Sequence, residues 1–320
     1  MNVRNVTGQD APELLELWNR AAPAQGYAPL TAGQMNELIF QNAHYDPALA
    51  FVLEEEGLHG FGCAAYGADL PGGAQRGYLS LAVVDEAAGR EGFDALLDRL
   101  EQALAQAGCK MADVLFFNPI RLPWLIPNTP GHTHNNVPGL WTQCAQHDWM
   151  LARGYDERAR ECAMYLPLNR FSIPQALEEK QTALARDDYF IEFYDGAVHT
   201  GLDGMLKTLG NPEWDAEISA CARDKVPFLA AVCGSEVVGF AGPVYPEPGG
   251  RGYFTGIGVT PAHKGRGLGT LLFYRLCQAE KEAGARYMSL FTGEKNPARH
   301  IYERAGFEAV RTFGILRKAL

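Results

Sequence analysis

The stretch that decides the fold runs from residue 259 to residue 270 and reads Val259-Thr260-Pro261-Ala262-His263-Lys264-Gly265-Arg266-Gly267-Leu268-Gly269-Thr270. An apolar run ends at Val259, and an amphipathic pattern that reaches about Ala283 follows the glycines. Glycine lets a backbone approach an anion closely, and the first-turn N–H groups of a helix have no partners of their own. With the helix dipole and the charges of Lys264 and Arg266, this strand-turn-helix predicts a pyrophosphate site.

Two better-known phosphate motifs differ from this turn. The spacing Gly265-x-Gly267-x-Gly269 is not Gly-x-Gly-x-x-Gly, and a Gly-x-x-x-x-Gly-Lys loop is absent from the sequence. An alternative for the motif taken alone is purely structural, with the glycines serving only a tight strand-to-helix turn.

The same pattern occurs a second time earlier in the chain. RGYLSLAVV at 76–84 aligns without a gap with RGYFTGIGV at 251–259, and Gly92 then falls on Gly267. Further on, Gly154 aligns with Gly306. An internal repeat in a chain of 320 residues predicts two copies of one domain.

Between these anchors the first copy is longer by one segment, 118–140, which is rich in proline and contains His132 and His134. We expect a surface loop here. A metal cluster of these histidines with Cys144 and His147 is the alternative, but the spacing matches no ligand pattern, so no metal is predicted.

The order of strands and helices indicates an α/β (α+β) fold in which each copy is a mixed, mostly antiparallel sheet flanked by helices. We expect an N-terminal domain at 1–170, a linker helix at 171–187 and a C-terminal domain at 188–320. Ser172 suits the cap of the linker helix and Pro174 its first turn.

The composition narrows the class of protein. A net charge of −10 argues against nucleic-acid binding, which needs a basic face. The sequence contains no run of about 18 apolar residues, so we expect no membrane span. The N-terminus lacks a signal-peptide profile. Seven scattered cysteines without a Cys-x-x-Cys indicate reduced, buried thiols. We expect a cytoplasmic protein, monomeric because the repeat forms a pseudo-dimer.

The segment Lys264–Gly269 resembles the acyl-CoA pyrophosphate loop of the GCN5-related N-acetyltransferases (GNAT), whose pattern is Arg or Gln, two residues, Gly, any residue, and Gly or Ala. Lys264 takes the place of the usual Arg or Gln. The segment Asn296–Phe307 resembles the second signature of the family, a helix with a tyrosine followed by Gly-Phe. Its asparagine comes one position late, because Lys295 occupies the usual place. The resemblance covers nearly the whole second half and implies two tandem GNAT domains.

The first copy is similar in fold pattern but not in chemistry. Its loop, Gly89–Asp94, ends in an aspartate where the last glycine stands in the second copy, and Glu91 adds charge that repels phosphates. Met150 aligns with Tyr302. A degenerate first unit beside an intact second one resembles the architecture of the mycothiol synthases, a tandem branch of the family.

The resemblance implies a role for each site residue. Tyr302 would be the general acid for the leaving thiolate, since a phenol is protonated at neutral pH. Backbone N–H groups of the strand before the loop would stabilise the oxyanion. Glu213 is a candidate base or amine-binding group, with Asp215 beside it, although a solvated helix start explains both equally well. The residues implied in acyl-CoA binding are Ile257, Gly258, Val259, Lys264, Gly265, Arg266, Gly267, Leu268, Gly269, Thr270 and Asn296.

The function implied is an acetyl-CoA-dependent N-acetyltransferase that transfers an acetyl group to a primary amine of a small molecule by direct attack. Two alternatives stay open: a non-catalytic acyl-CoA sensor or interaction protein, and acetylation of peptide N-termini. The strand position that carries a glutamate in some family members is occupied by Thr255 and Gly256, so the sequence leaves the base unassigned.

Overall fold

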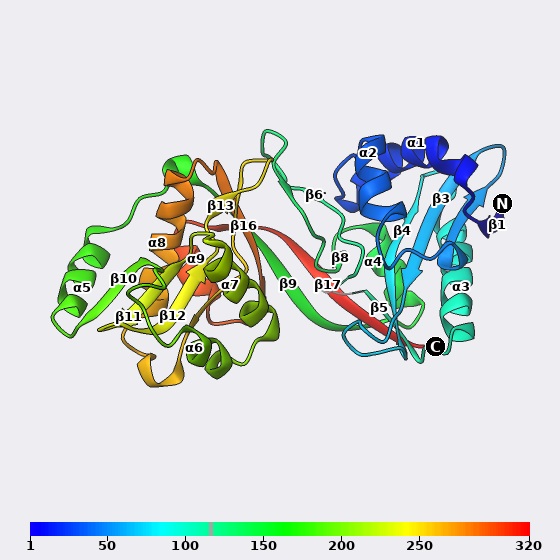
Figure 1. Ribbon diagram of the computed structural model, residues 1–320. Coiled ribbons are helices and arrows are strands. Elements are labelled where there is room, and N and C mark those ends of the chain that lie inside the picture. The colour runs from blue at the N-terminus through cyan, green and yellow to red at the C-terminus, as the bar shows by residue number, and fades with distance from the viewer. Residues whose placement is uncertain (115–117) are drawn as a thin grey trace. The chain divides into compact units, whose positions relative to one another are not determined.

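The computed structural model describes residues 1–114 and 118–320. Its contacts divide the chain into two compact units, and Figure 1 labels the elements of each. The N-terminal unit comprises Met1–Ala163, Phe291–Asn296 and Ala309–Leu320, and the C-terminal unit comprises Met164–Leu290 and Pro297–Glu308.

These units cut the chain in more places than the sequence-based boundaries 1–170, 171–187 and 188–320, which stay a prediction. The helix expected in the connecting segment is present as α5 (Gln175–Ala185). Pro174, expected in the first turn, instead occupies the N-cap position without a side-chain hydrogen bond, so Ser172 is not the cap.

The N-terminal unit is a mixed sheet with helices packed against it. Its neighbouring strands follow the order β1-β2-β3-β4-β5-β17, all antiparallel except the parallel pair β4 and β5, and β8 also pairs with β17. The elements are α1 (Ala11–Ala21), α2 (Ala32–Met35), α3 (Gly89–Gln106), α4 (Ala145–Ala152), β1 (Asn2–Asn5), β2 (Ala50–Glu54), β3 (Leu58–Ala65), β4 (Arg76–Val84), β5 (Met111–Val114), β6 (Trp124–Leu125), β7 (Thr133–His134), β8 (Leu140–Trp141), β9 (Asp156–Pro167, up to Ala163) and β17 (Glu308–Ala319, from Ala309).

Alternation along β2 shows how this sheet builds two cores. Phe51 and Leu53 belong to the apolar cluster that includes the buried face of α3, whereas Ala50 and Val52 belong to the cluster that includes α1. Successive side chains of a strand point to opposite faces, so the two helices cover opposite faces of the sheet.

The last strand of the chain, β17, completes the sheet of the N-terminal unit. It pairs antiparallel with β5, in a register that places Leu316 opposite Val114 and Ala319 opposite Met111. Figure 1 shows this strand in red beside β5. Residues from the two ends of the sequence therefore share one core, in which Leu316 is fully buried.

The C-terminal unit contains a four-stranded antiparallel sheet of order β10-β11-β12-β15. Side chains of α6 and α7 form a core with β11 and β12, and α8 also contacts these strands. Besides α5, its elements are α6 (Leu202–Leu209), α7 (Pro212–Asp224), α8 (Leu268–Glu282), α9 (Arg299–Arg304), β10 (Tyr189–Phe193), β11 (Leu229–Cys233), β12 (Glu236–Gly242), β13 (Tyr245–Pro246), β14 (Arg251–Tyr253), β15 (Gly256–Val259) and β16 (Tyr287–Gly293, up to Leu290).

The structure bears out the repeat in its backbone. Gly154, just after α4, and Gly306, just after α9, have φ angles of 86° and 93°, the left-handed conformation that commonly ends a helix. The two copies differ at the strand before the loop. Residues 76–84 form one continuous strand, whereas 251–259, expected as one strand, is interrupted at Phe254 and Thr255.

The segment 118–140 is more ordered and more buried than the surface loop that we expected. It contains a short hairpin in which Trp124 pairs with His134. Its alternate apolar residues are buried: Ile120, Leu122, Trp124 and Ile126. The prolines concealed this strand-like alternation. Within residues 1–114 and 118–320 we find no group of three or more His, Cys, Asp or Glu side chains that could hold a metal ion, and no helix whose length and hydropathy would suit a membrane span.

Candidate active site

The glycine-rich turn joins β15 to α8 as the sequence predicts. The chain leaves β15 at Val259, and Gly265 and Gly267 adopt φ angles of 82° and 87°. Side chains of L residues rarely fit this left-handed region, which explains the glycines. Gly267 is the N-cap of α8, whose first turn begins at Leu268, so the first N–H groups of the helix, which have no partner within the helix, lie at this turn.

A cavity of about 450 Å³ lies at this turn, and the C-terminal unit supplies its walls. The structure brings together ten of the predicted site residues around it, from β15, the turn, the start of α8 and α9: Ile257, Gly258, Val259, Lys264, Gly265, Gly267, Leu268, Gly269, Thr270 and Tyr302. The other lining residues are Lys180, His263, Phe273, Ala298 and Ile301.

Lys180 is a member of this site that the sequence analysis missed. It lies on α5, and its Nζ is so close to Gly267 that a Cβ on this glycine would collide with it. Arg275 of α8 holds α5 in place by donating hydrogen bonds to Gln181 (2.8 Å) and Glu178 (2.5 Å). An ammonium group therefore stands at the N-terminus of α8, where it reinforces the attraction for an anion.

Arg266 takes a different place from the one expected. Its Nε donates to the hydroxyl of Tyr189 (3.0 Å), its guanidinium lies 5.4 Å from the centre of that ring, and it does not line the cavity. The same hydroxyl is 2.9 Å from Nδ1 of His263. Tyr189 of β10 thus holds the turn by hydrogen bonds to two side chains of the turn, Arg266 and His263.

Tyr302 reaches the cavity from α9. Its ring packs on Phe273 of α8, with 4.8 Å between ring centres, and lies 6.3 Å from Phe307. Burial raises the pKa of the Tyr302 phenol above its ordinary value near 10. The hydroxyl is therefore protonated at neutral pH and is able to donate a proton to a stronger base.

The interruption at Phe254 and Thr255 separates two strands that belong to different sheets. β14 pairs in parallel with β16 through Arg251–Tyr287 and Gly252–Met288, whereas β15 pairs with β12. The chain therefore turns from one sheet to the other just before the cavity. Ile257, Gly258 and Val259 line the cavity after this change of partner.

A second group of side chains surrounds the interruption on the α7 side. Nε1 of Trp214 donates to the carbonyl of Thr255 (3.2 Å), and the same indole covers Gly256 so closely that a side chain there would collide. Tyr253 stacks on Tyr245 with 5.2 Å between ring centres. Burial, followed by the charge and hydrogen bond of Glu217, raises the pKa of Tyr253.

Glu213, the candidate base, is exposed in the first turn of α7, where its backbone N–H donates to Oδ1 of Asn211 (3.0 Å). Glu217, one helical turn later, is partly buried and bonded to Tyr253. The sequence analysis missed Glu217, although the i, i+4 spacing from Glu213 places it on the same face of the helix.

Asn296 is not brought to the cavity. It is exposed, belongs to the N-terminal unit and lines a different cavity, together with Glu157 and Glu161 of β9. Its role in acyl-CoA binding stays a prediction.

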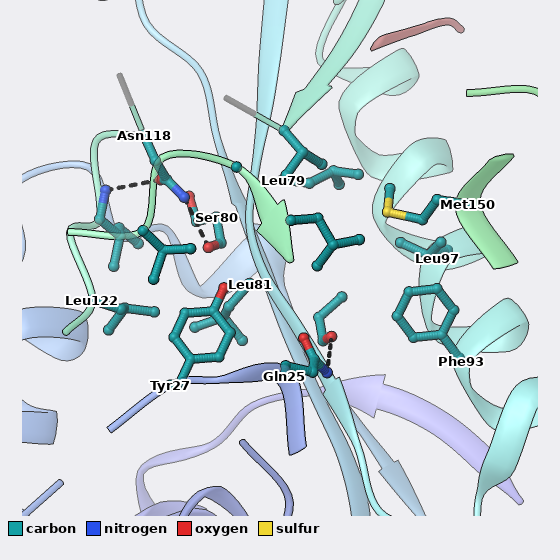
Figure 2. A pocket seen from close by; sticks show the side chains of 16 residues that line it. Gln25, Tyr27, Leu79, Ser80, Leu81, Phe93, Leu97, Asn118, Leu122 and Met150 are labelled. Atoms are coloured by element: carbon teal, nitrogen blue, oxygen red, sulfur yellow. Dashed lines mark hydrogen bonds between the residues drawn. The ribbon is translucent and has the colours of Figure 1, made fainter. Parts of the chain in front are cut away.

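The first copy has apolar side chains where the second has its site. Figure 2 shows Met150 beside Phe93 and Leu97 in a cavity of only about 30 Å³. Asp94, at the place of the last glycine, forms an ion pair with Arg153 (3.2 Å). No phenol stands at the position of Tyr302, because Met150 occupies it and is buried.

Comparison with known proteins finds a family model that matches the part of the chain around this site. Residues 186–307 match the model of the acetyltransferase (GNAT) family. Mycothiol acetyltransferase of Tsukamurella paurometabola is 40% identical over 82 residues, which are 26% of this chain and 27% of that protein. Streptothricin acetyltransferase of Streptomyces lavendulae is 33% identical over 85 residues, 26% of this chain and 45% of that protein. The matches thus span less than half the length of either relative.

A solved structure extends the likeness in fold to the whole chain. A tandem GNAT protein from the clavulanic acid biosynthesis pathway superposes with a TM-score of 0.60 over 99% of this chain and 98% of that one, at 15% identity. At this identity the likeness concerns the fold, two α/β units in tandem. Residues 186–307, which contain all of the cavity lining except Lys180, are thus similar to the acetyltransferase (GNAT) family.

Proposed function

We propose that the C-terminal unit transfers the acetyl group of acetyl-CoA to a primary amine of a small molecule by direct attack. The observation that carries the proposal is one cavity lined by the glycine turn, the start of α8, Lys180 and Tyr302. The cavity thus offers N–H groups and lysines for the pyrophosphate of acetyl-CoA and a buried proton donor, Tyr302, for its thioester sulfur.

The pyrophosphate is held by the N–H groups at the start of α8, with Lys180 and Lys264 as counter-charges. The adjoining strand, Ile257–Val259, offers backbone N–H groups to the thioester carbonyl. Rigid backbone donors suit an oxyanion, and one such donor lowers a barrier by about 3 kcal/mol.

In the reaction, the amine nitrogen forms a bond to the carbonyl carbon, and the carbon–sulfur bond breaks as the oxyanion collapses. Tyr302 donates its proton to the departing thiolate. The proton that the amine loses passes to Glu217 or Glu213, directly or through water, and solvent restores the phenol. Glu217 has the better position, since it is partly buried beside Tyr253.

The acceptor enters beside the strand interruption, where Trp214, Tyr253 and Tyr245 give aromatic faces and Glu217 a negative charge. Aromatic faces and a carboxylate attract an ammonium group. The two relatives are named mycothiol acetyltransferase and streptothricin acetyltransferase, and we propose a small acceptor for this chain by analogy with them.

The test is release of free thiol from acetyl-CoA in the presence of a panel of small primary amines, with a peptide carrying a free N-terminus as comparison. We expect turnover with at least one small amine and a large loss of kcat in Tyr302→Phe. Acyl-CoA binding without thiol release on any amine would instead identify a non-catalytic sensor. Turnover on the peptide alone would contradict the small-molecule acceptor.

A further inference from the structure

Arg311 of β17 is unusual among the arginines of this protein. Its guanidinium carbon lies 4.3 Å from the ring centre of Trp141 and 5.4 Å from that of Trp124, all within the N-terminal unit. Every other arginine that is at least partly buried forms an ion pair with a carboxylate: Arg4, Arg76, Arg153, Arg251, Arg275, Arg299 and Arg317. Within residues 1–114 and 118–320, Arg311 has no such partner.

The unsatisfied atoms of this cluster are all donors. Among the described residues, Nε and Nη1 of Arg311 and Nε1 of Trp124 are buried without a hydrogen-bond acceptor. Trp124 is 1% exposed. Buried donors without acceptors cost roughly 1–3 kcal/mol each, more for a charged group. Within the part of the chain that the structure describes, the surroundings of Arg311 and Trp124 therefore lack hydrogen-bond acceptors and a negative charge.

The packing keeps the guanidinium in this position. A Cβ on Gly26 would collide with Nη1, and Gly26 has a φ of 90°, so glycine both fits the turn and makes room for Arg311. Phe313, two residues along β17, packs on Trp124 with 5.4 Å between ring centres. The strand thus presents Arg311 and Phe313 on one face, against the segment 118–140.

The cluster also reaches solvent. Arg311 and Trp141 are only partly buried as residues, whereas Nε and Nη1 of Arg311 are themselves buried. Aromatic rings occupy the faces of a guanidinium, while its N–H bonds lie in its plane and match two oxygens of one anionic group. Burial lowers the pKa of Arg311, which is the cost of a desolvated, unpaired charge.

We propose that Arg311, with Trp124 and Trp141, forms a binding site in the N-terminal unit for a small molecule with a two-oxygen anionic group, a carboxylate or a phosphate. The site is independent of acetyl transfer, and the indoles supply apolar faces for the body of the same molecule. It gives the degenerate copy a ligand of its own.

The test titrates the full chain with sodium acetate and, separately, with inorganic phosphate, each at an ionic strength held constant with sodium chloride. Indole fluorescence and Tm are the readouts, because a ligand that binds only the native state raises Tm. We expect a saturable change in the wild type and in Arg121→Met, which removes an exposed arginine of the same segment. We expect none in Arg311→Met.

The acetate and phosphate arms distinguish a carboxylate site from a phosphate site. Phosphate that binds the turn at 264–270 changes the wild type and Arg311→Met alike, so the difference between them reports the new site. Arg311→Lys keeps the charge without the planar donors, and we expect about tenfold weaker binding. Because Arg311→Met removes an unpaired charge, it should fold, which its own Tm checks. The proposal is overturned if neither anion gives a saturable change, or if Arg311→Met responds like the wild type.

Discussion

Lys180 and Gly267 are in contact, so that the ammonium group of α5 lies at the N-cap of α8. They are far apart in the sequence, and only the docking of α5 on α8 through Arg275 brings them together. A helix outside the two family signatures thereby contributes a charge to the site.

The first prediction concerns this charge. Lys180→Met should raise the KM for acetyl-CoA about tenfold or more with little change in kcat, because a hydrogen bond to a charged group contributes roughly 1.5–3 kcal/mol to ground state and transition state alike. The control is Lys207→Met, which removes an exposed lysine of α6. Steady-state kinetics with acetyl-CoA as the varied substrate decide it, and equal KM values in both variants would remove Lys180 from the site.

The second prediction concerns the proton donor. Tyr302→Phe should lower kcat by about 10²-fold, the usual contribution of a general acid, while Tm stays close to that of the wild type. The donor form of a phenol exists below its pKa, and burial raises the pKa of Tyr302. Wild-type kcat should therefore fall only above about pH 10, and this alkaline limb should be absent in the variant. If the alkaline fall of kcat persists in Tyr302→Phe, it is caused by the ionisation of another group.

The third prediction separates the two glutamates of α7. Glu217→Gln should lower kcat/KM for the amine by about tenfold or more, since it removes the carboxylate bonded to Tyr253. Glu213→Gln is the matched control, one turn earlier and exposed, and should change kcat/KM less than twofold. The reverse ranking would return the role to Glu213.

The fourth prediction concerns Glu280 of α8, which is fully buried and accepts a hydrogen bond from the backbone N–H of Tyr245 (3.2 Å). Burial raises its pKa to about 9. A carboxyl group whose pKa is higher in the folded than in the unfolded chain stabilises the fold fully at low pH, and this stability is lost as the pH rises toward the folded pKa. The wild type should thus lose stability relative to Glu280→Gln from about pH 5 to pH 9.

The size of this loss is on the order of 1 kcal/mol per pH unit. Denaturant unfolding of both proteins at several pH values measures it. If the free energy of unfolding depends on pH in the same way in both proteins, the carboxyl group of Glu280 ionises in the folded protein without loss of stability.

Sequence reasoning succeeded where the chemistry is local. The glycine turn, α8 and the β11–β12 hairpin depend on neighbouring residues, and the repeat needs only alignment. It failed where contacts join distant segments. Nothing near Lys180 marks it as a residue of the cavity, and the interruption at Phe254 and Thr255 arises because β14 and β15 pair with different strands.

The same limit explains the two other differences. Proline and glycine dominate 118–140, so their turn propensity concealed the buried positions around Trp124. The motif predicts that Arg266 adds charge at the phosphate site, yet its side chain donates a hydrogen bond to Tyr189 of β10. Side-chain direction in such a turn depends on tertiary partners that no local pattern records.

The pairing of β17 with β5 also affects how the protein is made. Residues 309–320 are synthesised after residues 1–163, yet they supply a strand, with the buried Leu316, to the same sheet. During synthesis β5 therefore has an unpaired edge until β17 is made, and such an edge is open to misassociation. A chain stopped shortly before residue 309 would lack a strand of the N-terminal unit.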